Sequence, residues 1–169
     1  NHSKFKAKFG ETCSFTVIYG GSYKNIILIG TGKETELKSF KIEQLGGKAI
    51  CVAKAKKFAH LSILVSRTLG NYSEEEVMAL LASGAMLGSY KFDKYFSTSS
   101  QEGQEDKEFV IESLLIVGQS AKAAQSLFEE KKILAESVYF ARDLVSEAPN
   151  VLYPESYAEL IAKEFETLD

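Results

Sequence analysis

One stretch of this sequence has residue types in an order that could bind a phosphate group. Gly30-Thr31-Gly32-Lys33 follows an apolar run, as the glycine-rich loops of nucleotide-binding proteins do. A phosphate-binding loop, however, needs a glycine where Ile27 stands and a serine or threonine where Glu34 stands. A dinucleotide-binding fingerprint needs a third glycine where Thr35 stands. We therefore interpret the segment as a turn between a strand and a helix that uses the conformational freedom of glycine.

Ionisable residues form two further candidates. His60 could act as a catalytic base, but no Ser, Cys or carboxylate stands at a recognisable spacing from it in the sequence, and we interpret it as a surface or turn histidine. Ser73-Glu74-Glu75-Glu76 could supply metal ligands, yet three adjacent acids on a helix point in different directions. The Ser73 hydroxyl and the Glu76 carboxylate have the spacing of a capping box, so we expect this segment to start a helix.

A group of aromatic residues, Tyr90, Phe92, Tyr95 and Phe96, could stack against nucleic-acid bases. The formal net charge of the chain is -3, which supplies no basic surface for a nucleic acid. We therefore expect these rings to belong to an apolar core, and we expect no nucleic-acid partner.

The composition is that of a globular protein, and 169 residues favour a single domain. Cys13 and Cys51 are too few for a disulfide framework, and we expect Cys13 to be a reduced thiol in the core. No apolar run reaches the roughly 20 residues that span a bilayer. The start of the sequence is polar and basic and shows no secretory signal. These features predict a cytoplasmic protein without a membrane partner.

The apolar periodicity predicts the elements that must position these residues. Alternating or continuous apolar runs indicate strands, and a period of 3.6 residues indicates helices. Strands are expected at 13–19, 25–29, 61–65 and 109–117, and helices at 37–58, 74–95, 120–147 and 154–168. The polar segment 97–107 is expected to be an exposed loop. The alternation of strands and helices indicates an α/β sandwich with a mixed sheet.

The same patterns predict how the helices pack. Gly84 and Gly88 lie four residues apart on one helix face, which predicts a close approach of that helix to a neighbouring element. The residues expected to point inward are Phe40, Leu45, Val52 and Ala55 in the first helix, Val77, Leu80, Leu81, Leu87 and Phe92 in the second, and Ala124, Leu127, Phe128, Leu134, Val138, Ala141 and Val145 in the third. The apolar face of the last helix has little chain left to cover it and is expected to need a partner.

The segment ARDLVSEAPNVLYPE at 141–155 ends one helix, breaks at Ala148-Pro149-Asn150 and begins another helix at Pro154. It resembles the domain junction of the leucyl aminopeptidases, the cytosol aminopeptidase family. The matching positions are Arg142, Asp143, Leu144, Val145, Glu147, Asn150, Leu152, Pro154 and Glu155. Three positions depart from the family pattern, namely Ser146, the order Ala148-Pro149, and Tyr153, which leaves the next helix without a favourable N-cap.

Further segments upstream resemble the same family in order and spacing, so the resemblance covers nearly the whole chain. These segments are Gly10-Glu11-Thr12, Leu28-Ile29-Gly30-Thr31-Gly32-Lys33 and Gly84-Ala85-Met86-Leu87-Gly88-Ser89-Tyr90-Lys91-Phe92-Asp93-Lys94-Tyr95. The resemblance implies a macro-like three-layer sandwich with a mixed β-sheet flanked by helices. It also implies that residues 1–147 form the non-catalytic N-terminal domain, truncated at its start. Residues 148–169 would then be the elbow and the first helix of the absent catalytic domain.

What the resemblance implies for the whole protein is a metal-dependent aminopeptidase. Such an enzyme uses two Zn or Mn ions to remove N-terminal residues, leucine preferred, from peptides. The domain in hand would support a homo-hexamer and control access to the active sites.

The chemistry itself is expected to lie outside this chain. The family's Asn-Thr-Asp-Ala-Glu-Gly-Arg signature is absent from the sequence, as are His-rich or Cys-rich metal patterns and nucleophile motifs. We therefore assign no catalytic, cofactor-binding or metal-binding residue and expect the chain alone to be inactive. The alternative hypothesis is a macro-like module that binds a nucleotide or a nucleic acid.

Overall fold

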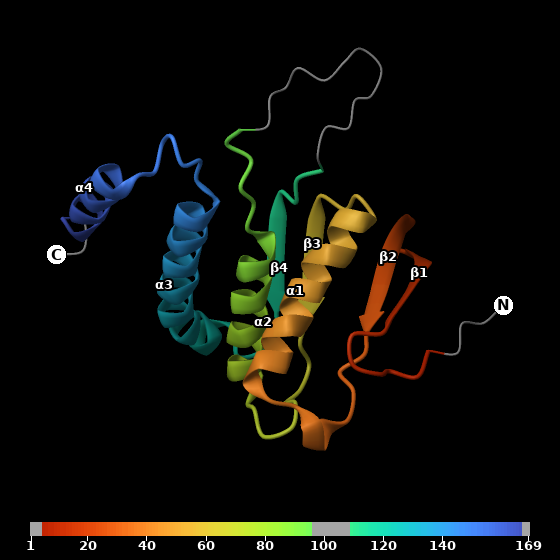
Figure 1. The fold of residues 1–169 in the computed structure, drawn as a ribbon. Coiled ribbons are helices and arrows are strands. Elements are labelled where there is room, and N and C mark those ends of the chain that lie inside the picture. Colours follow the sequence, from red (N-terminus) through yellow and green to blue (C-terminus); the bar gives the residue numbers. More distant parts are fainter. Residues whose placement is uncertain (1–4, 96–108, 167–169) are drawn as a thin grey trace, which may run out of the picture.

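The structure is a computed structural model that describes residues 5–95 and 109–166. Strands and helices alternate in the order expected, so the α/β class is confirmed (Figure 1). The strands are β1 (Thr12–Tyr19), β2 (Ser22–Ile29), β3 (His60–Leu64) and β4 (Ser113–Val117), and the helices are α1 (Ser39–Ala55), α2 (Glu74–Ser89), α3 (Ala121–Ser146) and α4 (Pro154–Phe165), with a 3-10 helix η1 at Glu34–Glu36. The loop expected at 97–107 lies outside the described residues.

The described strands form two separate pairs, whereas the sequence predicted one mixed sheet. β1 and β2 are antiparallel, from the Thr12–Ile29 pair to the Tyr19–Ser22 pair, and join through Gly20 and Gly21. Both glycines have positive φ angles, of 59° and 75°, which a tight hairpin turn requires. β3 and β4 are parallel, from the His60–Ser113 pair to the Leu64–Val117 pair. Within the described part, no ladder joins β2 to β3.

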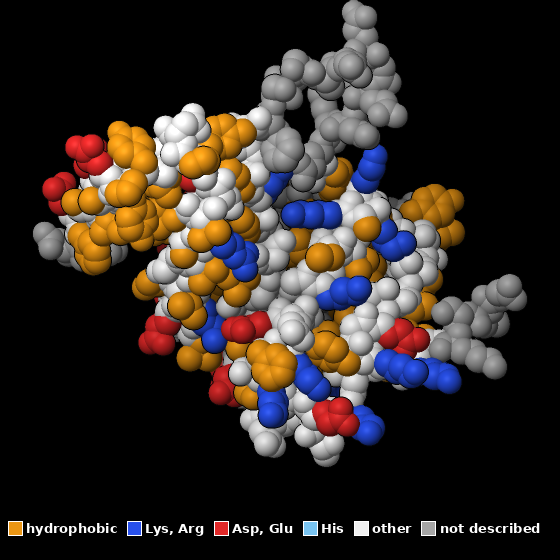
Figure 2. Space-filling view, viewed as in Figure 1, with side chains coloured by type: hydrophobic (Ala, Val, Ile, Leu, Met, Phe, Trp, Pro, Cys, Tyr) orange, Lys and Arg blue, Asp and Glu red, His pale blue; other side chains and the backbone are white. Residues whose placement is uncertain are grey.

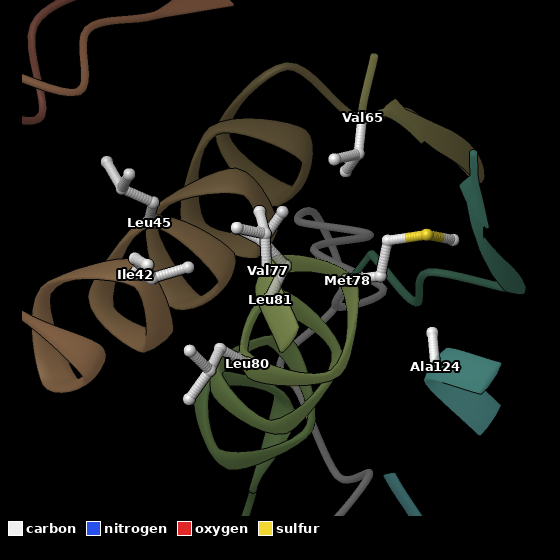
Figure 3. Packing of buried hydrophobic residues seen from close by; sticks show 8 residues of the cluster. All are labelled: Ile42, Leu45, Val65, Val77, Met78, Leu80, Leu81 and Ala124. Carbon is white, nitrogen blue, oxygen red and sulfur yellow. The ribbon is translucent and has the colours of Figure 1, made fainter. Parts of the chain in front are cut away.

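The core lies where α1 and α2 pack against each other and against β3 and β4. Ile42, Val77 and their buried neighbours form one cluster (Figure 3). Strand residues Ile29, Ile63 and Ile116 pack against this cluster from both sheets. The two strand pairs therefore share one core, although they do not share a ladder. None of the described helices is long and apolar enough to cross a membrane.

Glycines allow α1 and α2 to approach so closely that their backbones touch. A Cβ atom on Gly84 would lie 1.7 Å from the carbonyl oxygen of Glu43, and one on Gly46 would lie 2.1 Å from that of Leu81. A Cβ on Gly88 would lie 2.9 Å from the Cα of Gly47. The close approach predicted from Gly84 and Gly88 is confirmed, and its partner is α1.

This contact sets the inward face of α1, and there the sequence prediction was partly wrong. Leu45 is buried as expected, but Phe40 is 49% exposed and Ala55 is exposed. The buried apolar residues of this helix are Ile42, Leu45, Ala49, Ile50 and Ala53, which share the face of Gly46. The buried face of α1 is therefore the face on which Gly46 allows the backbones of α1 and α2 to come into contact.

The predicted bounds and faces of two other helices also need correction. α2 ends at Ser89 rather than near Tyr95, because Tyr90 is extended (φ -51°, ψ 138°). Along α3, Ala124 is buried as predicted, but Leu134 is 64% exposed and Val145 is 87% exposed. Within the described part, only one edge of α3 is covered, by α2.

The α1–α2 contact makes a testable prediction about Gly84. Alanine has the higher helix propensity, yet Gly84→Ala is expected to lower the free energy of unfolding by about 2 to 3 kcal/mol, because its Cβ would collide with the Glu43 carbonyl. Gly47→Ala is the matched control, since the nearest atom to its Cβ, the Gly84 carbonyl oxygen, would lie 3.3 Å away. Urea unfolding of both variants measures the difference, and equal effects would contradict the prediction.

Candidate domain junction

The residues at the end of α2 and just after it meet the last turns of α3 through a set of hydrogen bonds and an ion pair. Its members, called the junction clamp below, are Tyr90, Lys94 and Tyr95 on one side and Tyr139, Arg142, Asp143 and Glu147 on the other. The clamp joins segments about 50 residues apart in the sequence. It fixes α3 at the point where the chain leaves the body of the fold.

The first part of the clamp satisfies the end of α2. The last carbonyl groups of a helix have no partner inside the helix. The Tyr139 hydroxyl donates to the carbonyl oxygen of Met86, and Arg142 Nη1 donates to that of Leu87 over 3.1 Å. A cationic side chain at a helix C-terminus also interacts favourably with the helix dipole. α3 therefore provides the C-terminal cap of α2.

The second part of the clamp is centred on Tyr90. Its hydroxyl donates to Asp143 Oδ1 over 2.7 Å. Its ring lies 5.1 Å from the ring of Tyr139, and the Arg142 guanidinium lies 5.3 Å from its centroid. Desolvation and the hydrogen bond to Asp143 raise the pKa of the Tyr90 hydroxyl above its ordinary value. The sequence predicted that the Tyr90 ring lies in the apolar core. Instead, Tyr90 connects the end of α2 to α3 through both a hydrogen bond and ring contacts.

The third part of the clamp holds Glu147, the residue that follows α3. Its side chain is 13% exposed, and Lys94 Nζ lies 2.7 Å from its Oε2 atom. The Tyr95 hydroxyl and the amide of Ala148 donate to the other carboxylate oxygen. The hydrogen bond from Lys94 lowers the pKa of Glu147 despite the opposing effect of desolvation. The ionised carboxylate thus ties residues 94–95 to the first residue of the elbow.

The elbow itself is a compact turn. The amides of Val151 and Leu152 both donate to the carbonyl oxygen of Ala148 over 2.9 Å. α4 then begins at Pro154, as the sequence predicted. Tyr153 offers no favourable cap, but its amide donates to the Ser156 hydroxyl over 3.0 Å, which is one half of a capping box. The expected loss of a cap is therefore partly compensated.

α4 stands apart from the body of the fold. None of its residues is buried, and it makes no extensive contact with another described element. Tyr157, Leu160 and Phe165 expose apolar surface, and Figure 2 shows hydrophobic side chains gathered over this helix. An exposed apolar face of this kind is typical of a surface that another element covers.

A second polar contact holds the other end of α3. The Ser73–Glu76 capping box is confirmed, because the Ser73 amide donates to Glu76 over 2.7 Å and the Glu76 amide donates to Ser73 over 3.4 Å. Glu74 has a role that the sequence did not reveal. Its carboxylate accepts the amide of Gln119 over 2.6 Å, just before α3. The amide group at this helix start is thus occupied by a carboxylate of the chain itself.

The other candidate motifs are accounted for by backbone and side-chain contacts. The amide of Gly30 donates to the carbonyl of Glu11 over 2.7 Å, and that of Gly32 to the carbonyl of Ala7 over 3.0 Å. A Cβ on Gly30 would lie 2.2 Å from the Lys8 carbonyl oxygen. The glycines therefore allow residues 7–11 to lie directly against residues 30–32, and the amides of Gly30 and Gly32 are not available to bind a phosphate.

His60 has neighbours that the sequence did not reveal. Its Nδ1 atom lies 2.9 Å from the Ser113 hydroxyl, and its Nε2 atom lies 3.7 Å from the Glu112 carboxylate. The side chains of His60, Glu112 and Ser113 are all exposed. The group links the starts of β3 and β4. The amides of Glu112 and Ser113 both donate to the Ala59 carbonyl, so neither of them is available to stabilise an oxyanion.

Across residues 5–95 and 109–166, the structure brings together no group of three or more His, Cys, Asp or Glu side chains that could hold a metal ion. Two or more ions would need such a cluster of carboxylates. The residues present therefore do not fit a two-metal centre. The assignment of no catalytic, cofactor-binding or metal-binding residue remains a prediction.

Comparisons with known proteins place this geometry in context. A model described as "Cytosol aminopeptidase family, N-terminal domain" matches residues 1–99. The chain is 38% identical over 170 residues to the probable cytosol aminopeptidase of Rickettsia bellii and 35% identical over 169 residues to that of Rickettsia rickettsii. These alignments cover 100% and 99% of the chain, but 33% of each relative. The chain thus spans about a third of the length of the curated relatives it matches.

Solved structures show the same fold. A mutant of tomato leucine aminopeptidase superposes with a TM-score of 0.75 at 24% identity, covering 96% of this chain and 30% of that one. The bottromycin maturation enzyme BotP, in complex with Mn, superposes with a TM-score of 0.74 at 18% identity, covering 97% of this chain and 32% of that one.

The clamp predicts a specific response of stability to pH. The pKa of Glu147 is lower in the folded chain than its ordinary value of 4.5, so its ionised form stabilises the fold above that pH. This stabilisation is lost as the pH falls through the folded-state pKa. Glu147→Gln is therefore expected to lower the free energy of unfolding at pH 7, and the difference from the original chain should vanish in acid.

Urea unfolding between pH 7 and pH 3 measures this difference. Glu129→Gln is the matched control, because Glu129 is an exposed glutamate of α3 with no ion pair in the described part. A Glu147→Gln effect that persists unchanged in acid would show that the carboxylate charge is not what stabilises the junction.

Proposed function

The chain belongs to the cytosol aminopeptidase family, and on that basis we propose that it is the non-catalytic N-terminal domain of a metal-dependent leucyl aminopeptidase. The observation that carries the proposal is the match of residues 1–99 to the family's N-terminal domain, in a chain one third as long as its relatives. The longer protein removes N-terminal residues, leucine preferred, from peptides in the cytoplasm. Its two Zn or Mn ions are held outside this chain.

The proposed division places the domain at residues 1–147 and the start of the catalytic domain at 148–169. The clamp supports this boundary because its last member is Glu147. Beyond it, α4 contacts no other described element extensively and exposes an apolar face. That face would pack inside the catalytic domain, and the clamp would set the direction in which the chain enters it.

The proposed fold of the complete domain is a macro-like three-layer sandwich with one mixed sheet. The shared core of the two strand pairs supports this, because Ile29 and Ile63 pack against the same cluster. A strand between β2 and β3 would join the pairs. The opposite faces of the strands, where Phe15, Leu28 and Leu64 are exposed, would then be covered by the third layer.

The proposed role of the domain itself is structural. It would support a homo-hexamer and limit access to the active sites, with the direction of the catalytic domain fixed by α3. The residues described here favour this over a nucleotide-binding module. The amides of Gly30, Gly32 and Gln119, which could hold a phosphate, already donate to oxygens of the chain.

Activity measurements test the proposal directly. The longer protein that contains this chain is expected to hydrolyse leucyl p-nitroanilide with Mn or Zn and to lose that activity with a chelator. The 169-residue chain is expected to show none, because its described residues hold no cluster of metal ligands. Metal-dependent turnover by the highly purified chain, or a metal-independent longer protein, would contradict the proposal.

A substitution in α4 tests the domain division. Leu160→Ser is expected to change the free energy of unfolding of the 169-residue chain by less than about 0.5 kcal/mol, since Leu160 is exposed there. In the longer protein the same change should cost about 2 kcal/mol or more, because the side chain would be buried. Glu159→Ser, beside it on the same helix, is the control and should be tolerated in both. Equal tolerance of Leu160→Ser in both proteins would place α4 outside the catalytic domain.

A further inference from the structure

An apolar groove of about 620 Å³ lies between β4, the outer half of α2 and the start of α3. Its floor consists of small side chains, among them Ala79, Ala82 and Ala124. Both methionines of the chain, Met78 and Met86, line it. Figure 3 shows the Met78 side chain directed towards β4, beside Ala124. Methionine is flexible and polarisable, and it is frequent at surfaces that accept varied apolar partners.

The wall of this groove is the edge of a strand. Consecutive residues of β4 line the groove, although their side chains alternate between the half-buried and the exposed face of the strand. The groove therefore follows the backbone of β4. The amide of Ser113 and the carbonyl of Val117 bond towards β3. Alternate residues of a strand bond in opposite directions, so Leu114 and Ile116 direct their amides and carbonyls to the other edge. No described strand pairs with that edge.

We infer that this groove binds an extended peptide with apolar side chains, which adds to the β4 edge as a parallel strand. An unpaired edge specifies an extended backbone, because only a strand can satisfy its alternating donors and acceptors. The alanine floor specifies apolar side chains on every second residue. β4 has five residues, which is about 17 Å of strand and matches a peptide of five or six residues.

The charge of the groove fixes the direction of the peptide. Glu112 is the ionisable residue of the lining, and it precedes the first residue of β4. A free amino terminus beside Glu112 is complementary to this charge, and the peptide then runs parallel to β4. His60, 3.7 Å from the same carboxylate, is the neighbouring group with which the amino terminus would compete.

The inference is independent of the proposed aminopeptidase role, because it concerns residues of this chain only. The two methionines provide the measurement. In the 169-residue chain labelled with carbon-13 at the methionine methyl groups, the signals of Met78 and Met86 should both move, saturably, on addition of the peptide Leu-Ser-Leu-Ser-Leu-Ser amide. Failure of either signal to move at millimolar peptide would overturn the inference.

Two N-methylated versions of this peptide test the strand geometry without altering the protein. Methyl groups on the alternate amides that face β4 should weaken binding about tenfold or more, while methyl groups on the other amides should not. Equal affinity of the two versions would show that no strand forms. This comparison decides the matter even if a protein variant fails to fold.

Substitutions locate the site. Ala82→Trp fills the groove and should weaken binding about tenfold, whereas Ala55→Trp, on an exposed helix position away from the groove, should not.

N-acetylation of the peptide should weaken binding about threefold, and Glu112→Gln should abolish that difference. Methionine signals that move with protein concentration alone, and not with peptide, would instead assign the groove to a contact between two copies of the chain.

Discussion

The structure depends on the contact between the backbones of α1 and α2. Gly46 and Gly84 leave no room for a side chain between the two helices. This closeness determines which face of α1 is buried, and it brings Ile42 and Val77 into one cluster with residues of both strand pairs. It also places α2, on which α3 packs. The core is thus specified by the absence of side chains as much as by their presence.

Polar groups hold α3 on α2 at both ends, in addition to the burial of Ala124 and Ala135 along its length. Glu74, in the first turn of α2, accepts the amide of Gln119 ahead of α3. Arg142 and Tyr139, near the end of α3, donate to the last carbonyls of α2. Helix ends are where backbone groups lack partners, so each helix supplies what the other needs. Directional bonds therefore constrain the position of both ends of α3 and of the elbow after it, together with the apolar packing of the helix.

Local features of this arrangement could be predicted from the sequence, and pairings between distant residues could not. The Ser73–Glu76 capping box, the Gly84–Gly88 face and the break before Pro154 each depend on residues within a few positions. The bond between Tyr90 and Asp143 joins residues 53 apart, and periodicity holds no information on it. The early end of α2 at the extended Tyr90 allows residues 90–95 to reach α3 and Glu147. The predicted inward face of α3 was partly wrong, because periodicity shows that a face is apolar but not what covers it.

The uncovered apolar surfaces of the chain follow a consistent pattern. Within the described residues, exposed large apolar side chains occur on α4, on α3 and on the strands, for example Phe165, Val145 and Leu64, and also on α1 at Phe40. The polar contacts, in contrast, concentrate on the side of α3 that faces α2. Directional bonds fix the position of an element only where both partners are present, whereas apolar faces accept any well-packed partner. The position of α3 is thus defined by directional contacts within the chain itself. The exposed apolar faces have no comparable directional contacts, so the packing of any element against them would depend on burial.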